Sequence, residues 1–492
     1  MGRAIIFTVW LLIIFGPLAG LQAMDDRPNI LFAIADDWGW PHAGAYGDPV
    51  VKTPTFDRVA REGVLFENAF VSAPSCTPSR NAILTGQYHW RLGYGANLHS
   101  RLDTKHQTYP HLLEDAGYFT GHWRKSWGPG KLDNWDRHPA GEKFKSFDDF
   151  LEQWPRDQPF CFWFGASDPH RGYKKNSGRD SGMDLSQIEL FPHFPDSPEV
   201  RGDVADYYWE VQRFDRELGQ AMVKLESIGQ LDNTVVVVTG DHGMPFPRCK
   251  SNLYDSGSRV PMAVRWPAKI QAGRKVTDLV STQDLAPTFL ALANVPVPPA
   301  MTGRDWVSLL ESPRSGRIES DRGQVFTGKE RHVLAQESPD TGGTPMRAIR
   351  TDDYLLIRNF TPDRWPAGTP NYGKATIPGV WLGDCDNGPT KTYMVDHRDD
   401  DAEHRLKYDL SFSKRPEFEL YVQAEDPGQL NNVAEQPKYK SVVQQLNARL
   451  TAELKRTSDP RILGLGVEVF DKTKYMGQGP RHPDSRKNRQ KK

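Results

Sequence analysis

The chain has 492 residues, which is too long for one small core and suits one large domain plus a smaller one. Hydrophobic residues make up 38% and charged residues 25%, as in an ordinary globular protein. Lys and Arg number 62 against 63 for Asp and Glu, so the net charge of -1 excludes a whole-chain field that attracts nucleic acid. Any attraction for an anion must therefore come from a local pocket.

The first residues have the pattern of an export signal. Arg3 supplies a positive start, Ile5 to Leu18 is mostly apolar, and Leu21-Gln22-Ala23 offers a small-residue cleavage point. The apolar run is short for a membrane span, so cleavage is favoured over an anchor. We predict a signal peptide over residues 1–23 and a secreted or periplasmic protein, lysosomal if it comes from an animal, with no membrane attachment after cleavage.

The first strand candidate is Ile30 to Ala35, a continuous apolar run typical of strands covered on both faces. It leads directly into the acidic pair Asp36-Asp37. Read alone, this pair also fits a solvated turn at the end of a strand.

The next feature is the segment from Cys76 to Gly86, CTPSRNAILTG. Pro78 and Ser79 suit a helix start and Gly86 suits its end, which places Cys76 at the positive end of a helix. Arg80, one turn further on, adds a bidentate partner for an oxyanion. From its position alone, Cys76 could equally be a plain reactive or buried thiol. The other three cysteines allow one disulfide at most, which is no disulfide framework.

Two further apolar runs, Phe160 to Phe164 and Val235 to Thr239, have the same strand character. The first leads into Asp168 and His170, and the second into Asp241-His242. Between them a helix is predicted from one apolar stripe that Gly229 ends, formed by Val204, Tyr207, Val211, Phe214, Leu218, Ala221 and Leu225. This alternation predicts an α/β fold, with a large mixed, mostly parallel sheet sandwiched by helices.

The pattern changes after about residue 330. Short strands are predicted at Met346 to Ile349, Tyr354 to Ile357 and Glu419 to Val422, and a helix near Ser441 to Leu454. We therefore divide the chain into a catalytic domain over residues 24–330, a smaller C-terminal α+β domain with an antiparallel sheet over 331–470, and a basic tail over 471–492 that is disordered by default.

The polar clusters after the three apolar runs are expected to meet. In open parallel sheets, ligands bind outside the carboxyl ends of the strands, so neighbouring strands would bring Asp36, Asp37 and Asp241 to one edge. Converging carboxylates repel one another, and a divalent cation removes that cost. Oxygen ligands suit Ca²⁺ or Mg²⁺.

The Cys76 to Gly86 segment resembles the signature of the sulfatase family, Cys-x-Pro-x-Arg followed by Thr-Gly. The resemblance covers most of the chain, from Pro28 to about Val433. It implies a type I, formylglycine-dependent sulfatase of the alkaline phosphatase superfamily, with the fold of that superfamily. It also implies that a separate formylglycine-generating enzyme oxidises Cys76, and that each chain holds one Ca²⁺.

The resemblance assigns metal ligands residue by residue. Asp36, Asp37, Asp241 and His242 match the family's ligands, joined by the residue at position 76. His242 stands where some members have Asn, and imidazole is a softer ligand than an amide oxygen.

It also assigns sulfate contacts. Arg80 matches the residue that holds residue 76 and the sulfate, Lys250 matches a sulfate-binding Lys, and His170 matches the His that contacts sulfate or protonates the leaving group. In the family mechanism, a hydroxyl of hydrated formylglycine attacks sulfur, Asp241 accepts its proton, and the second hydroxyl expels sulfate.

One motif departs from the family pattern, Gly-Lys-x-His-x-Gly. Arg124 falls where the family Lys sits, with Lys125 next to it, so either could be the sulfate ligand. Ser126 falls on the family His. His122 or a bound water is a hypothetical substitute.

Within the family, the chain most resembles the N-sulfoglucosamine sulfohydrolases, also called heparan N-sulfatases or sulfamidases. Three stretches carry this resemblance: 194–207, 244–254 and 345–360. They imply hydrolysis of N-sulfates or sulfate esters of a sulfated glycan. A scaffold shared with O-sulfatases of other polysaccharides, a phosphatase or phosphonate hydrolase, and a non-catalytic glycan-binding relative are the alternatives.

Overall fold

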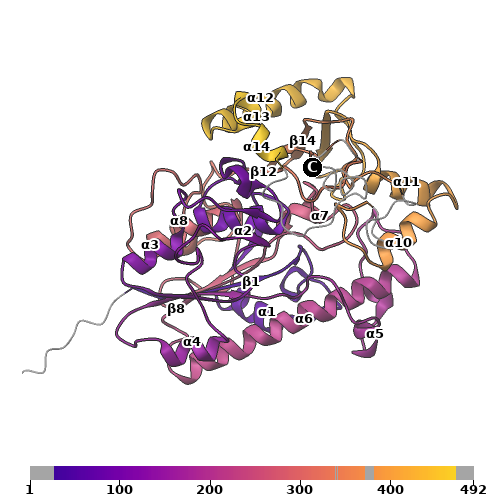
Figure 1. Ribbon diagram of the computed structural model, residues 1–492. Helices are drawn as coiled ribbons and strands as arrows, with labels where there is room; N and C mark the ends of the chain where they lie inside the picture. The colour runs from indigo at the N-terminus through magenta and orange to yellow at the C-terminus, as the bar shows by residue number, and fades with distance from the viewer. Residues whose placement is uncertain (1–26, 338–339, 341, 372–381, 473–492) are drawn as a thin grey trace, which may run out of the picture.

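The computed structural model describes residues 27–337, 340, 342–371 and 382–472. The predicted signal peptide and most of the predicted tail lie outside the described residues. The described chain forms two main sheets with helices around them (Figure 1). None of its helices is both long and apolar enough to cross a bilayer.

The larger sheet has nine strands, and its centre is parallel. Strands β8, β1, β7, β4 and β6 run parallel side by side, and β10 pairs antiparallel with both β8 and β2. In spatial order the strands are β11 (Arg274–Ser281), β2 (Val64–Phe70), β10 (Met262–Arg265), β8 (Thr234–Gly240), β1 (Asn29–Ala35), β7 (Phe160–Gly165), β4 (Phe119–Arg124) and β6 (Glu142–Lys143), with β9 (Arg259–Val260) beside β2. The predicted mixed, mostly parallel sheet is confirmed.

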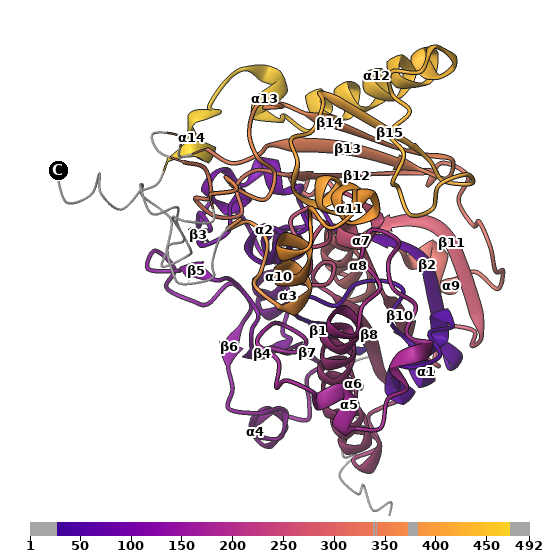
Figure 2. The same cartoon turned by 90° about the vertical axis from the view of Figure 1, so that its right-hand side faces the viewer.

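Both faces of this sheet are covered by helices. Along β1, Leu31, Ala33 and Ala35 belong to the apolar cluster shared with α1 (Pro54–Arg61), α4 (Phe147–Gln153) and the long α6 (Pro198–Ser227). The alternate residues Ile30, Phe32 and Ile34 belong to the cluster shared with α2 (Cys76–Thr85), α3 (Tyr109–Asp115), α8 (Leu285–Leu292) and α9 (Val307–Glu311). Figure 2 shows α6 and α2 on opposite sides of the sheet. Since successive strand residues point to opposite faces, a strand buried on both must be apolar throughout.

Helix α2 begins at Cys76, with Ser75 as its N-cap residue. It ends at Gly86, whose φ of 62° is left-handed. A Cβ at Gly86 would lie 2.7 Å from the sulfur of Met301, so both the backbone and the packing require glycine here.

The smaller sheet is antiparallel, in the order β12 (Gln324–Lys329), β13 (Met346–Thr351), β14 (Tyr354–Asn359) and β15 (Phe418–Val422). One face packs on Leu446, Leu450 and Leu454 of α12 (Lys440–Arg456). The other face packs on Leu253 and Tyr254, which come after strand β8 of the larger sheet in the chain. The sheet begins at β12, a few residues before the predicted boundary at 331.

The remaining elements are short or connect these layers. They are β3 (Ser100–Arg101), β5 (Gly130–Lys131), α5 (Ser177–Asp180), α7 (Asp255–Ser258), α10 (Pro389–Asp396), α11 (Ala402–Phe412), α13 (Pro460–Leu463) and α14 (Glu468–Asp471). All four cysteines are buried and free, so the one disulfide that the sequence allowed is not formed.

Candidate active site

Two neighbouring strand ends deliver three acids to one point at the edge of the larger sheet. Asp36 and Asp37 follow β1, and Asp241 follows its neighbour β8. The backbone N–H of Asp37 donates to Asp241 Oδ1 at 2.8 Å, and all three side chains are buried. Asp37 has a left-handed backbone with φ of 72°, which is uncommon for a residue other than glycine and often marks a functional turn.

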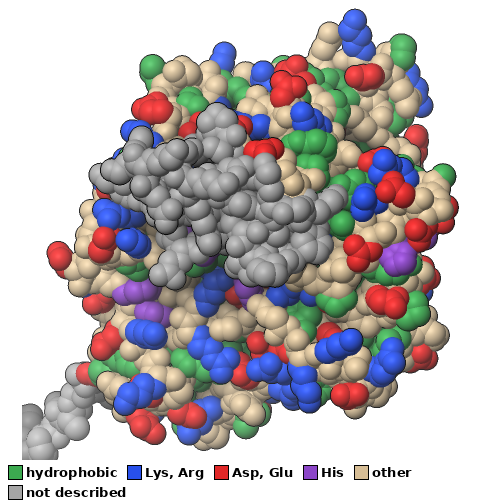
Figure 3. Space-filling view, turned by 45° about the vertical axis from the view of Figure 1, so that its right-hand side comes forward, with side chains coloured by type: hydrophobic (Ala, Val, Ile, Leu, Met, Phe, Trp, Pro, Cys, Tyr) green, Lys and Arg blue, Asp and Glu red, His purple; other side chains and the backbone are tan. Residues whose placement is uncertain are grey.

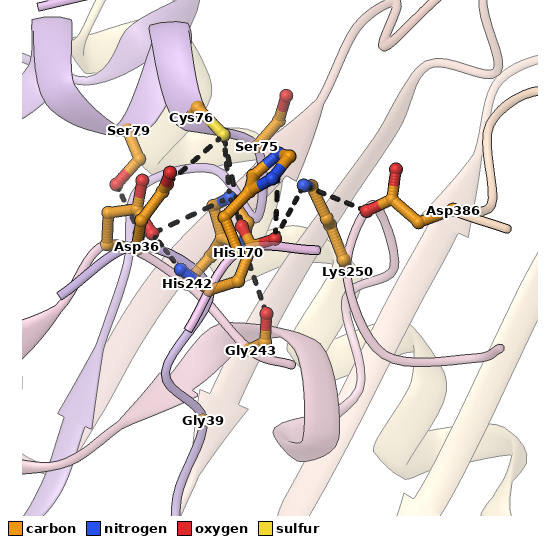
Figure 4. A network of polar contacts seen from close by, with 12 residues as sticks. Asp36, Gly39, Ser75, Cys76, Ser79, His170, His242, Gly243, Lys250 and Asp386 are labelled. Carbon is orange, nitrogen blue, oxygen red and sulfur yellow. Dashed lines mark hydrogen bonds and ion pairs between the residues drawn. The ribbon is translucent and has the colours of Figure 1, made fainter. Parts of the chain in front are cut away.

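Cys76 faces these acids from the N-terminus of α2. Its Sγ lies 3.7 Å from Asp36 Oδ1, 4.0 Å from Asp37 Oδ1 and 3.3 Å from His242 Nε2 (Figure 4). Burial raises the pKa of the Cys76 thiol well above its usual range, although Lys125 and Lys250 oppose this. The protein's own groups therefore do not turn Cys76 into a thiolate nucleophile.

The donor set fits a divalent cation. Asp37, Cys76 and His242 offer ligand atoms within 4.8 Å of one another, and so do Asp36, Cys76 and Asp241. Nδ1 of His242 lies 3.0 Å from the Gly243 carbonyl oxygen, and donation there leaves the Nε2 lone pair facing Cys76 and Asp37.

The charge balance of this cluster also favours a cation. Burial raises the pKa of Asp36, Lys125 opposes the rise, and Asp241 and Asp37 add to it by repulsion. A bound cation would relieve this repulsion between carboxylates.

Three buried or largely buried cations surround the acids. Arg80 is fully buried, and its Nε donates to Asp241 Oδ2 at 2.8 Å. Lys125 Nζ lies 2.6 Å from both carboxylate oxygens of Asp36, and Lys250 Nζ lies 2.8 Å from Asp37 Oδ2. Figure 3 shows Lys and Arg side chains interspersed with Asp and Glu over the described part of one face of the molecule.

Arg124 and Lys125, which the sequence left as alternatives, point to different places. The Arg124 guanidinium stacks on the Trp123 ring and pairs with Glu217 at 2.9 Å, with 37% of its side chain exposed. Its backbone is left-handed, with φ of 50°, where β4 ends. Of the two cations, Lys125 is the one that contacts the acids.

His170 lies at the open side of the site, after β7. Its side chain is 40% exposed, and its Nε2 lies 4.0 Å from Asp37 Oδ2. It is the most exposed of the residues in the cluster, which suits a group that meets a substrate entering from solvent.

Ser126 stands at the position of the family His, and His122 is its hypothetical substitute. Ser126 is buried. His122 lies within β4, where its Nδ1 is 3.0 Å from the Gly141 carbonyl oxygen and its ring stacks on His138 at 4.1 Å. Within the described part of the chain, its ring contacts these two residues and not the acid cluster.

Two residues that the sequence did not indicate, Asp386 and His332, complete the wall of the site. Asp386 pairs with Lys250 at 2.9 Å (Figure 4), and His332 Nδ1 lies 2.8 Å from the Ser75 hydroxyl. Asp386 and His332 follow the first strand of the smaller sheet and lie in loops, so they have no strand end or motif to mark them. Only the acidic character of the segment around Asp384 and Asp386 could have drawn attention to it.

Known proteins match this chain over most of its length. The sulfatase profile matches residues 28–295, and the profile "N-sulphoglucosamine sulphohydrolase, C-terminal" matches residues 240–366. Human N-sulphoglucosamine sulphohydrolase is 29% identical, over 88% of this chain and 91% of that protein. An ulvan-active sulfatase of Formosa agariphila is 26% identical, over 89% and 76%.

The fold is also shared with solved structures. That of BT4656 in complex with its substrate D-glucosamine-2-N,6-O-disulfate has a TM-score of 0.61 and 21% identity, covering 88% of this chain and 98% of that one. Together with the sequence matches, this places the chain in a family of sulfuric ester hydrolases. The chain belongs to the sulfatase family.

Proposed function

We propose that this protein is a formylglycine-dependent sulfatase that removes N-linked sulfate from a glucosamine-type sugar of a sulfated glycan. The observation that carries the proposal is the convergence of Asp36, Asp37 and Asp241 on Cys76 at a helix N-terminus, with Lys125 and Lys250 on either side. This arrangement combines a metal-type donor set with cations suited to sulfate oxygens.

We propose Asp36, Asp37, Asp241 and His242 as ligands of one Ca²⁺, together with residue 76. When bound, this ion would offset negative charge on the sulfate and on the residue that attacks it. Burial alone would raise the pKa of Asp241, but the neighbouring cations Arg80 and Lys125 lower it. Asp241 is therefore ionised at neutral pH and can accept a proton from residue 76.

The other side chains bind sulfate and protonate the leaving atom. Arg80 and Lys125 donate on one side of the acid cluster and Lys250 on the other, so developing charge on the sulfate oxygens meets fixed donors. His170, at the open side, is placed to donate a proton to the departing nitrogen or oxygen.

We propose that Cys76 is converted to formylglycine by a separate maturation enzyme. The buried thiol has a raised pKa and is a poor nucleophile at neutral pH. Formylglycine supplies an oxygen nucleophile that can also expel the sulfate afterwards.

The proposal of an N-sulfated substrate rests on two findings. Residues 240–366 match the profile of the C-terminal part of N-sulphoglucosamine sulphohydrolase, and the human enzyme of that name aligns over 88% of this chain. An O-sulfatase of another polysaccharide is the second candidate, because the ulvan-active sulfatase aligns over 89% of this chain. The predicted signal peptide supports secretion or export to the periplasm as the setting of this activity.

The test is to express the full-length chain with a formylglycine-generating enzyme and load it with Ca²⁺. We expect mass analysis to find residue 76 oxidised, and sulfate to be released from N-sulfated glucosamine in preference to 6-O-sulfated glucosamine and to a phosphate ester. Cys76→Ala should lower turnover by at least about 10⁴-fold, since no attacking oxygen remains. An unmodified thiol in fully active protein, or turnover at wild-type rates in the Ala variant, contradicts the proposal.

A further inference from the structure

Asp386 brings a fourth carboxylate into a site that binds an anion. It pairs with Lys250 at 2.9 Å, while Lys250 also donates to Asp37 Oδ2 at 2.8 Å. Asp37 belongs to the cluster of possible metal ligands, but Asp386 does not. A carboxylate beside a sulfate site repels the substrate, so its presence there requires a role.

The loop that carries Asp386 is held firmly in place. On one side of it, Asp384 accepts a hydrogen bond from the backbone N–H of Val333 at 2.8 Å and pairs with the buried Lys329 at 3.1 Å. On the other side, Lys391 Nζ donates to Oδ1 of Asn387 at 2.9 Å, and it also donates to the carbonyl oxygen of Cys385 at 2.7 Å. Two buried lysines thus hold the residues on both sides of Asp386.

The same loop is locked against the segment that carries His170. A Cβ at Gly388 would lie 2.4 Å from the Arg171 guanidinium, so the Arg171 side chain packs directly against the Gly388 backbone. Arg171 makes a bidentate ion pair with Asp203 at 2.7 and 2.8 Å, and the Thr390 hydroxyl donates to Asp203 at 2.7 Å. Asp386 is therefore positioned with the same precision as the residues around it.

The hydrogen-bond inventory of Lys250 leaves one position for a substrate. An ammonium group has three donors. One donates to Asp37, and a second lies within ion-pair distance of Asp386, 2.9 Å from its Oδ2. The side chain of Lys250 is 4% exposed, whereas that of Asp386 is 28% exposed and borders the open part of the site. Burial opposes the ionised form of Asp386, but the ammonium group of Lys250 lowers its pKa below its usual range, so it carries a negative charge at neutral pH.

We propose that Asp386 is a positioning residue that holds Lys250 in the wall of the site and offsets part of its charge, so that sulfate is bound weakly enough to be released after each turnover. The inference rests on the proposed function, because it takes sulfate as the anion that Lys250 meets. The ion pair gives Lys250 a fixed direction, and the repulsion between Asp386 and the sulfate lowers the affinity for the product.

The substitution that isolates this role is Asp386→Asn. It keeps the shape and an oxygen acceptor for Lys250 but removes the charge. We expect the metal-loaded, full-length variant to bind inorganic sulfate about tenfold more tightly in a calorimetric titration. Both KM and kcat for sulfate release should fall, because the product leaves more slowly. A carboxylate with a merely structural role would give weaker binding when it is removed, so the tightening distinguishes the two.

Two further variants serve as checks on this result. Asp386→Ser removes the charge through a different side chain and should also tighten sulfate binding. Asp400→Asn removes an exposed carboxylate that pairs with His397, and should leave the affinity unchanged. Unchanged or weaker sulfate binding in both Asp386 variants overturns the inference. The titration needs no turnover, so it decides the role of Asp386 separately, while a wild-type protein that releases no sulfate from any sugar contradicts only the proposed function.

Discussion

The two sheets contribute to the site in different ways. The larger sheet places Asp36, Asp37 and Asp241 directly after buried parallel strands, so their positions follow from the backbone of the core. The smaller sheet places no strand end in the site, and its region contributes His332 and Asp386 from connecting loops. The acids that we assign to chemistry therefore follow buried strands of the larger sheet, and the residues that adjust the site come from loops of a region packed against it.

The two sheets also differ in what covers their faces. Strand β1 is buried on both faces by helices, whereas the smaller sheet lies between α12 and the Leu253–Tyr254 segment. Since Leu253 and Tyr254 closely follow Lys250 along the chain, the smaller sheet supports the segment that carries this lysine. The comparison predicts that substitutions in the first region, that of the larger sheet, mainly lower the rate of sulfate release. Substitutions in the second region, that of the smaller sheet, should mainly lower the free energy of unfolding.

The largest effect is expected from Lys125→Met, with Arg124→Met as its matched neighbour. Lys125 contacts both carboxylate oxygens of Asp36, while Arg124 pairs with Glu217 at the surface. We expect kcat/KM for sulfate release to fall by about 10²–10³-fold in the Lys125 variant and by less than about threefold in the Arg124 variant. Equal losses in the two variants would contradict the assignment of Lys125 to the site.

In the second region, Arg347→Met tests stability rather than chemistry. Arg347 is fully buried and pairs with Glu330 and Asp459, each at 2.6 Å. Removing it leaves buried carboxylates short of a partner, so we expect a loss of about 3–5 kcal/mol in the free energy of unfolding measured in urea. Hydrogen exchange should locate the loss in β12, β13 and β14.

Its control is Arg317→Met, which removes a partly exposed partner of Asp352. This control should cost less than about 1 kcal/mol. If Arg347→Met abolished sulfate release in molecules that remain folded, the division of roles between the two regions would be wrong.

A smaller effect is expected from His122, which lies within the first region but outside the acid cluster. Burial lowers its pKa from the usual 6.5 to about 4. The folded protein therefore binds fewer protons than the unfolded chain between these values, and the contribution of His122 to stability is present above pH 6.5 and is lost as the pH falls towards 4.

Between pH 6.5 and pH 4.5, the free energy of unfolding of His122→Asn should fall by about 1–2 kcal/mol less than that of the wild type. It should retain sulfate release, because its ring contacts Gly141 and His138. An unchanged slope of stability with pH would contradict the first expectation. Loss of sulfate release in the folded variant would restore His122 as a substitute for the family His.

The parts of the fold that could be predicted from the sequence are those with strong local patterns. Strands β1, β7 and β8 are continuous apolar runs because both of their faces are buried, and α2 has recognisable start and stop residues. The assignment of a sulfatase rested on the Cys76 segment and is confirmed by the family match.

The remaining features depend on tertiary contacts that no local pattern encodes. The choice between Arg124 and Lys125 follows from a left-handed backbone at Arg124, which turns the two side chains apart. Asp386 reaches Lys250 across more than a hundred residues of chain, through a loop fixed by two buried lysines. Such long-range approaches depend on how the two sheets pack, which sequence spacing does not reveal.

The burial of Cys76 bears on whether its oxidation would come before or after folding. Only 2% of its side chain is exposed, and it is enclosed by residues that follow β8, more than 150 positions later in the chain. Under the proposed function, the enzyme that oxidises this cysteine would therefore have to reach it before those later segments have folded over it. Maturation would then compete with folding in time, and a nascent chain that folds too quickly would be trapped as an inert thiol form.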